Sequence, residues 1–276
     1  MPYLDDDKRK KVTVNTILAR KGKGKKITVL TAYDHFMAGL LDKAGIDMIL
    51  VGDSASNVVH GHDSTLPITM EVMLAHTAAV ARGAGKAMVI ADMPFLSFQP
   101  SIETAVTNAG RFLKEAGAEA VKMEGGIEMA ATVRRVVECG IPVMGHIGLT
   151  PQSINRFGGP RVQGRKDSSR AYQKESAEAL QEAGAFSLVL ELVQADLAAE
   201  ITRALDTTAT IGIGAGPHCD GQVLVVNDLL GMRPEGFKPK FLRQYADLPP
   251  TILEAVGKYI EDVKSGSFPS DDESYI

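Results

Sequence analysis

The stretch "IDMILVGDS" (residues 46–54) is followed, after residues 55–68, by "TMEVMLAHTAAVARGAG" (69–85). The first segment is apolar from Met48 through Val51 and then reaches Asp53 and Ser54. Continuous apolar runs of this kind indicate a parallel strand that is covered on both faces. The second segment is amphipathic and ends in glycine, which is typical of a helix with a glycine C-cap. These two segments predict one βα unit.

The same unit recurs along the chain, and it predicts the fold class. Eight strand candidates cover residues 26–34, 46–54, 87–95, 118–126, 141–149, 185–193, 207–216 and 221–230. Amphipathic stretches separate most of them, and a last helix is expected over 251–266. Eight such units over roughly 250 residues favour a closed (βα)8 TIM barrel. An open doubly wound sheet is the alternative, but it requires a glycine-rich turn after the first strand, and "TAYDHF" (31–36) has none.

Length and composition set the domain organisation. The chain has 276 residues, 45% hydrophobic and 23% charged, which predicts one globular barrel domain over 1–276. We expect a short N-terminal extension and a frayed acidic tail, "SDDESYI" (270–276). Two early basic clusters, "KRKK" (8–11) and "KGKGKK" (21–26), are interpreted as solvated surface and a flexible turn.

Charge and cysteine usage exclude several classes of partner. A formal net charge of −4 gives no indication of nucleic-acid binding, and no apolar run approaches the ~20 residues of a membrane span. Two cysteines, Cys139 and Cys219, are too few for a disulfide framework. The N-terminus lacks the apolar core of a signal peptide. We therefore expect a cytoplasmic protein that acts on small molecules.

Ionisable side chains stand at the carboxyl ends of almost all the predicted strands. In a barrel these ends form one face, and the active site belongs there. In chain order they bring Asp34, Asp53 with Ser54, Asp92, Lys122 with Glu124, His146, Glu191 and the glycine-rich run "GIGAG" (212–216). This convergence is the main functional signal of the sequence.

The acidic members of this set predict a metal site. Carboxylates on a shared low-dielectric rim repel one another unless a cation or protons intervene. Asp53, Asp92 and Glu124 therefore suggest a hard metal ion. Because the set has oxygen ligands and no Cys–His pattern, Mg²⁺ is favoured over Zn²⁺.

Simpler interpretations remain open for single residues. An aspartate after a strand is often only a helix N-cap, and Asp34 is interpreted as one. Lys122 lies in an apolar strand and needs a partner, while Glu191 interrupts another apolar strand as a general base would. His146 ends a strand among glycines, and a site role and a structural role are equally open. The long connection 150–169 has the length of a lid or binding loop.

Several long motifs resemble one family. They are "TAYD" (31–34), "VGDSASNVVHG" (51–61), "ADMPF" (91–95), "VKMEGG" (121–126), "GHIGLTPQSINRFGG" (145–159) and "IGIGAGPHCDGQVLV" (211–225). In order and spacing they are similar to those of the ketopantoate hydroxymethyltransferases. The resemblance implies a (βα)8 barrel of the phosphoenolpyruvate/pyruvate superfamily, assembled as a homo-oligomer, a decamer. It also implies transfer of a one-carbon unit from methylenetetrahydrofolate to 3-methyl-2-oxobutanoate through a metal-stabilised enolate, giving ketopantoate (2-dehydropantoate) for pantothenate and coenzyme A biosynthesis.

The resemblance also assigns roles to the rim residues. It implies that Asp53 and Asp92 bind one Mg²⁺ per subunit and contact the substrate, and that Glu124 completes the metal site. Ser54 and Lys122 are implied to bind the substrate carboxylate, and His146 to belong to the substrate site. Glu191 is implied to be the catalytic acid/base, either for proton abstraction from the substrate or for proton management during folate turnover.

Two other functions compete with this one. A Mg²⁺-dependent lyase or mutase of the same barrel superfamily would also act on a 2-oxo acid, but such enzymes typically place a reactive cysteine or a phosphonate-binding set in a flexible loop. The connection 150–169 contains no cysteine. A barrel kept only for assembly would be free to lose several charged rim residues, whereas this chain retains the full set.

Overall fold

The computed structural model describes residues 9–233, 236 and 239–275. The chain divides into two compact units, Met1–Val225 and Val226–Ile276, and each is described by itself.

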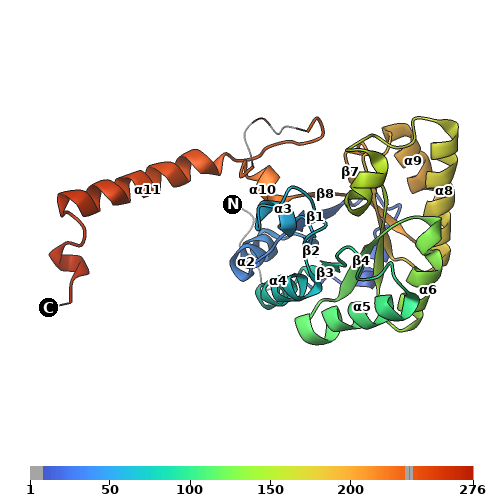
Figure 1. The fold of residues 1–276 in the computed structure, drawn as a ribbon, viewed down its shortest axis with the longest axis horizontal. Helices are drawn as coiled ribbons and strands as arrows, with labels where there is room; N and C mark the ends of the chain where they lie inside the picture. The colour runs from blue at the N-terminus through green and yellow to red at the C-terminus, as the bar shows by residue number, and fades with distance from the viewer. Residues whose placement is uncertain (1–8, 234–235, 237–238, 276) are drawn as a thin grey trace. The chain divides into compact units, whose positions relative to one another are not determined.

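The first unit contains a closed barrel of eight parallel strands in the order β1 to β8, with β8 paired to β1. This confirms the predicted (βα)8 fold, and helices surround the strands on the outside (Figure 1). The strands are β1 Ile27–Thr31, β2 Met48–Val51, β3 Met88–Asp92, β4 Ala120–Glu124, β5 Val143–Gly148, β6 Ser187–Glu191, β7 Ala209–Ile213 and β8 Gly221–Leu224. The last strand is shorter than predicted, since the expected segment 221–230 leaves the sheet after Leu224.

Helical elements precede β1 and follow each of the strands β1 to β6, whereas β7 leads into β8 without a helix. The helical elements are α1 Val14–Leu18, α2 His35–Ala44, α3 Ala55–Val58, α4 Met70–Gly83, α5 Ile102–Ala116, η2 Ile127–Met129, α6 Ala130–Glu138, η3 Pro151–Ser153, α7 Ile154–Phe157, α8 Asp167–Glu182 and α9 Ala195–Ala204. The predicted glycine C-caps are confirmed at Gly45 and Gly117, which end α2 and α5 with φ of 91° and 72°. The same prediction for α4 is wrong, because that helix ends at Ala84 with extended backbone. Asp34 accepts a hydrogen bond from the backbone N–H of Met37, so its interpretation as a helix cap is also confirmed.

The barrel interior is filled with aliphatic and methionine side chains. Met48 and Leu50 of β2 and Met88 of β3 belong to this core, which Val12 and Ile17 join from the N-terminal segment. Side chains of a strand alternate between its two faces, so the residues between them pack against the helices. The core thereby fixes the strand ends that carry the polar rim.

The sequence suggested that the two basic clusters are solvated surface, but each of them contains a lysine that is paired with a carboxylate. The Lys11 ammonium lies 2.7 Å from a carboxylate oxygen of Glu119, and the Lys21 ammonium lies 2.8 Å from one of Asp220. Glu119 and Asp220 precede β4 and β8, so these cations neutralise carboxylates at the amino ends of strands. Lys8 lies outside the described residues.

The second unit contains α10 Val226–Leu229, α11 Leu248–Ser265 and η4 Asp271–Glu273. The predicted last helix is confirmed, with an earlier start than expected. Asp228 lies in α10 rather than in a strand. Among the described residues, no helix is both long and apolar enough to cross a membrane.

Candidate active site

Six ionisable side chains meet at the carboxyl ends of five consecutive strands, as predicted. Asp92, Lys122, Glu124 and His146 lie within strands β3 to β5 and are almost fully buried, while Glu191 at the end of β6 is half-buried. Asp53 follows β2 and is buried as well. Register explains the convergence, because Asp92 is opposite Lys122 and Glu124 is opposite His146.

Lys122 is the central cation of the cluster. Its ammonium donates to both carboxylate oxygens of Asp92 at 2.7 Å and lies 3.7 Å from Oε1 of Glu124. Burial alone would lower the pKa of Lys122, but the surrounding carboxylates of Asp92, Glu124 and Asp53 outweigh it and hold the pKa above its ordinary value. Lys122 is therefore a fixed positive charge at neutral pH.

Asp53 is the carboxylate of the cluster whose negative charge is least balanced by nearby positive charge. Burial raises its pKa well above the ordinary value, and repulsion by Asp92 and Glu124 raises it further against the opposing effects of Lys122 and Gln152. Its backbone N–H donates to Oδ2 of Asp92 at 3.2 Å, and its own Oδ2 accepts from the Gln152 side chain at 3.0 Å. A cation beside Asp53 would remove the cost of ionising this carboxyl group.

His146 lies between two carboxylates. Its Nδ1 is 3.4 Å from Oε1 of Glu124, and its Nε2 is 3.3 Å from Oε2 of Glu191. The ring nitrogens and Oε1 of Glu124 have no aligned hydrogen-bond partner among the described residues, so these contacts are ion pairs. Burial and Lys122 lower the pKa of His146, but the two carboxylates raise it to about 9. The ring is therefore protonated at neutral pH.

Ser54 stands beside this cluster rather than in it. It precedes the short helix α3 without capping it, and its hydroxyl lies 2.8 Å from the hydroxyl of Tyr33. The Ser54 hydroxyl is thus held in place by Tyr33, and it makes no hydrogen bond to the charged side chains of the cluster.

Gln152 is a site residue that the sequence reasoning missed. Its amide N–H₂ donates to Oδ2 of Asp53 at 3.0 Å and to the backbone oxygen of Met93 at 2.9 Å. Its backbone N–H donates to Oε2 of Glu124, also at 3.0 Å. Gln152 belongs to η3 in the long connection after β5, so the length of that connection and its place in the motif "GHIGLTPQSINRFGG" were the available signals.

The donor set fits a divalent cation in charge. Among the described residues, Lys122 and protonated His146 are the only cationic partners of the carboxylates of Asp92, Glu124 and Glu191, and Asp53 has no ion pair of its own. Two negative charges therefore stay uncompensated when all four carboxylates are ionised. Oδ1 of Asp53 accepts no hydrogen bond from the described residues, and Oε1 of Glu124 is buried without one. Within the same residues no three His, Cys, Asp or Glu side chains are already arranged to hold a metal. Lys122, which occupies both oxygens of Asp92, would have to share that carboxylate.

A parallel barrel with ionisable residues at its carboxyl ends has the architecture of a TIM-barrel enzyme, and solved structures share this fold. Phosphonopyruvate hydrolase matches with a TM-score of 0.60 at 14% identity over 96% of this chain and 92% of its own. A 2,3-dimethylmalate lyase, a member of the PEP mutase/isocitrate lyase superfamily, matches with a TM-score of 0.57 at 16% identity over 95% and 91%. At these identities the likeness shows the fold alone, a TIM barrel of the type found in that superfamily.

The sequence comparison is more specific than the fold. The profile of the ketopantoate hydroxymethyltransferase family matches residues 11–271, and the chain belongs to this family. A 3-methyl-2-oxobutanoate hydroxymethyltransferase of Syntrophus aciditrophicus (strain SB) is 58% identical over 98% of both chains. Another, of Geotalea uraniireducens (strain Rf4), is 55% identical over 97% of this chain and 99% of its own. The predicted family is confirmed.

Proposed function

We propose that the protein is a 3-methyl-2-oxobutanoate hydroxymethyltransferase, which converts 3-methyl-2-oxobutanoate and methylenetetrahydrofolate into ketopantoate and tetrahydrofolate. The proton on C3 of the oxo acid is removed, and C3 forms a bond to the methylene carbon as the two bonds of that carbon to the folate nitrogens break. Water supplies the hydroxyl group of the product, and the two nitrogens take up one proton from C3 and one from water. The contiguous chain of charges from Asp53 to Glu191 at the barrel mouth is the observation that carries this proposal. The protein belongs to a family whose members at 55–58% identity, matched over nearly their full length, are named 3-methyl-2-oxobutanoate hydroxymethyltransferase.

Ser54, which follows β2, and Lys122, in β4, bind the oxo acid. Lys122 stays positively charged within the cluster and attracts the carboxylate of the oxo acid, and the Ser54 hydroxyl donates to the same group. Asp92 holds the Lys122 ammonium in position through both of its oxygens. The substrate is thereby oriented with its keto group toward the acidic residues.

Asp53 and Asp92 hold Mg²⁺, and Glu124 completes the site. The uncompensated charge around Asp53 supports this assignment, and a phosphonopyruvate hydrolase with the same fold has been solved in complex with oxalate and Mg²⁺. When bound, the ion supplies positive charge that stabilises the enolate form of the oxo acid. Gln152 orients Asp53 and Glu124 toward each other through its side chain and its backbone N–H.

Glu191 is the acid/base. It is the most accessible carboxylate of the cluster, and its Oε2 lies 3.3 Å from the protonated ring of His146. His146 fixes the position of the carboxylate and is itself anchored from the other side by Glu124. Glu191 either removes the C3 proton or manages protons during folate turnover, and the exchange experiment that closes the Discussion separates the two roles.

The cysteines provide no support for the alternative lyase or mutase. Cys139 is exposed at the C-terminal end of α6, and Cys219 is buried before β8. Both therefore lie at the amino ends of strands, whereas the charged cluster lies at the carboxyl ends. A reactive cysteine at the barrel mouth is thus missing from the part of the chain that the structure describes.

Assembly and location are a separate proposal. The chain forms a homo-oligomer, a decamer as the family resemblance implies, and works in the cytoplasm. Helix α11 supports an assembly because apolar residues recur along it at helical spacing, at Ile252, Val256, Tyr259 and Val263. Light scattering of the purified protein tests this, and a monomer at micromolar concentration would contradict it.

Product formation tests the proposed function. Purified protein is mixed with 3-methyl-2-oxobutanoate and methylenetetrahydrofolate, and ketopantoate is measured by NMR. We expect product with Mg²⁺ present and none after removal of divalent metal by a chelator. If no ketopantoate forms under any metal condition, the proposed function is wrong. If it forms equally well with the chelator, the metal assignment alone is wrong.

A further inference from the structure

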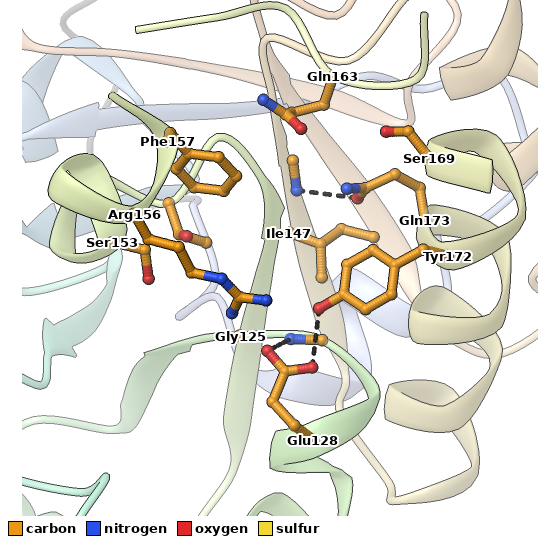
Figure 2. A pocket seen from close by; sticks show the side chains of 13 residues that line it. Gly125, Glu128, Ile147, Ser153, Arg156, Phe157, Gln163, Ser169, Tyr172 and Gln173 are labelled. Atoms are coloured by element: carbon orange, nitrogen blue, oxygen red, sulfur yellow. Dashed lines mark hydrogen bonds between the residues drawn. The ribbon is translucent and has the colours of Figure 1, made fainter. Parts of the chain in front are cut away.

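A cavity of about 220 Å³ lies beside the charged cluster, between α7 and α8. Phe157 and Arg156 line it from α7, and Tyr172 and Gln173 line it from α8 (Figure 2). Ile147 of β5 lies between these two walls. Since neighbouring side chains of a strand point to opposite faces, Ile147 faces this cavity while His146 faces the barrel interior. The cavity is therefore distinct from the cluster that binds the oxo acid.

The cavity nevertheless ends against the same strand ends. Its lining residues Gly125 and Ile147 directly follow Glu124 and His146, and the backbone N–H of Gly125 donates to the backbone oxygen of His146 at 3.0 Å. Gly148, also in the lining, is the register partner of Glu191. A ligand in the cavity would have one end at the strands that carry three of the proposed site residues.

Glu128 gives the cavity a fixed hydrogen-bond acceptor. Its Oε1 accepts from the backbone N–H of Gly126 at 3.2 Å, and its Oε2 accepts from the Tyr172 hydroxyl at 2.7 Å. A carboxylate has about four lone-pair sites, so it retains room for two further donors. A planar ring with two adjacent N–H donors matches this acceptor, in the same way that a guanidinium matches a carboxylate.

Arg156 supplies a donor next to that acceptor. Its guanidinium points into the cavity (Figure 2). It makes no hydrogen bond or ion pair with the described residues, although it lies close enough to Tyr172 to lower the pKa of that hydroxyl against the larger effect of burial. Phe157 and Ile147 add apolar surface for a ring. A few directional polar groups within apolar walls are the usual composition of a small-molecule site.

We propose that this cavity binds the pterin ring of the folate co-substrate, an inference that rests on the proposed function. The 2-amino group and the adjacent ring N–H donate to Glu128, and the neighbouring ring carbonyl accepts from Arg156. The ring lies between Phe157 and Tyr172. The cavity is smaller than typical ligand pockets, which reach about 300–1,000 Å³, so it holds the ring while the aminobenzoyl-glutamate tail extends into solvent.

Calorimetric binding of 5-formyltetrahydrofolate to the intact protein tests the assignment without requiring turnover. We expect Glu128→Gln to weaken binding at least tenfold and Arg156→Met about fivefold. Tyr172→Phe keeps the carboxylate but loses the hydroxyl that orients it, and should weaken binding about threefold. The matched controls Glu178→Gln on α8 and Arg134→Met on α6, both exposed and outside the cavity lining, should bind within twofold of wild type.

The outcomes separate the cavity from the function. If wild type makes ketopantoate but Glu128→Gln binds within twofold of wild type, the cavity assignment is wrong and the proposed function stands. A loss in Arg156→Met alone would indicate a simple anion site and would also overturn the assignment. If wild type makes no ketopantoate, the proposed function fails whatever the cavity binds. The tail fragment 4-aminobenzoyl-glutamate should show no dependence on Glu128, and such a dependence would contradict the ring orientation.

Discussion

The two ends of the barrel differ in how the charge of their buried carboxylates is balanced. At the amino ends of the strands, Asp47 pairs with Arg20 at 2.6 Å, and Asp220 pairs with Lys21 at 2.8 Å. These carboxylates also accept hydrogen bonds from backbone N–H and hydroxyl groups; Oδ2 of Asp47, for example, accepts from both the backbone N–H and the hydroxyl of Thr28. At the carboxyl ends, four carboxylates share one lysine and one histidine. The first end is neutralised within the protein, whereas the second has more carboxylates than cations among the described residues.

On the proposed function, this difference separates carboxylates that stabilise the fold from carboxylates that serve the site. A carboxylate with its own cation and backbone donors stabilises the fold and has little left to offer a ligand. A carboxylate that is buried among others, as Asp53 is, is costly to ionise and lowers the stability of the fold unless a cation binds beside it. Neutralising a carboxylate should therefore have opposite effects on stability at the two ends, whereas removing a cation should destabilise at both and reduce turnover only at the carboxyl ends.

The largest effect is expected for Lys122→Met. The change leaves Asp92, Asp53 and Glu124 buried without their shared cation, which should cost about 3–5 kcal/mol in the free energy of unfolding and lower turnover about 10²- to 10³-fold. Lys21→Met removes the partner of Asp220 at the other end and should also destabilise, with turnover per folded molecule unchanged. Denaturant unfolding and steady-state assays measure both, and equal losses of turnover in the two variants would contradict the comparison.

Asp53→Asn should separate stability from activity. It removes one charge from a repulsive cluster, so the free energy of unfolding with chelator present should rise by roughly 1 kcal/mol while turnover falls at least about 10²-fold. Asp47→Asn loses the ion pair with Arg20 and should lower the free energy of unfolding by about 1–3 kcal/mol with turnover unchanged. A destabilising Asp53→Asn would show that this carboxylate is structural after all.

His146 should make the metal-free protein less stable at high pH. Its pKa is raised from 6.5 to about 9, so the stabilisation is fully present below pH 6.5 and is lost as pH rises through about 9. The corresponding loss is roughly 3 kcal/mol between these limits. Unfolding measured with chelator across this range tests it. His146→Gln should remove this component, and an unchanged pH profile in that variant would assign the effect to another group.

Gln152→Leu should have the smallest effect. It removes the amide that reaches Asp53 while keeping the backbone N–H that donates to Glu124, so we expect about a tenfold higher Mg²⁺ requirement and little change in stability. Gln181→Leu is the matched control, because its amide only accepts from the backbone N–H of Thr207. If both variants shift the Mg²⁺ requirement equally, Gln152 does not position Asp53.

The sequence predicted the barrel and the rim because both depend on local signals. Apolar runs such as Met48–Val51 identify strands, and a parallel fold necessarily brings their carboxyl ends together. The partners were less accessible, since the contact of Lys122 with Asp92 depends on register and on side-chain rotamers. Gln152 is uncharged and lies in a loop, where no periodicity singles it out. Lys21 was misinterpreted because a basic cluster resembles solvated surface until its distant partner, Asp220, is known.

The most direct test of the account is hydrogen exchange at C3 of 3-methyl-2-oxobutanoate in D₂O, followed by NMR without folate. The account predicts exchange with Mg²⁺, none with a chelator, and at least about a hundredfold slower exchange in Glu191→Gln. Exchange that needs the metal but survives in Glu191→Gln would move the base elsewhere and assign Glu191 to folate turnover. Exchange equally fast with the chelator, or none even after tetrahydrofolate is added, would contradict activation of the oxo acid by the carboxylate-rich rim.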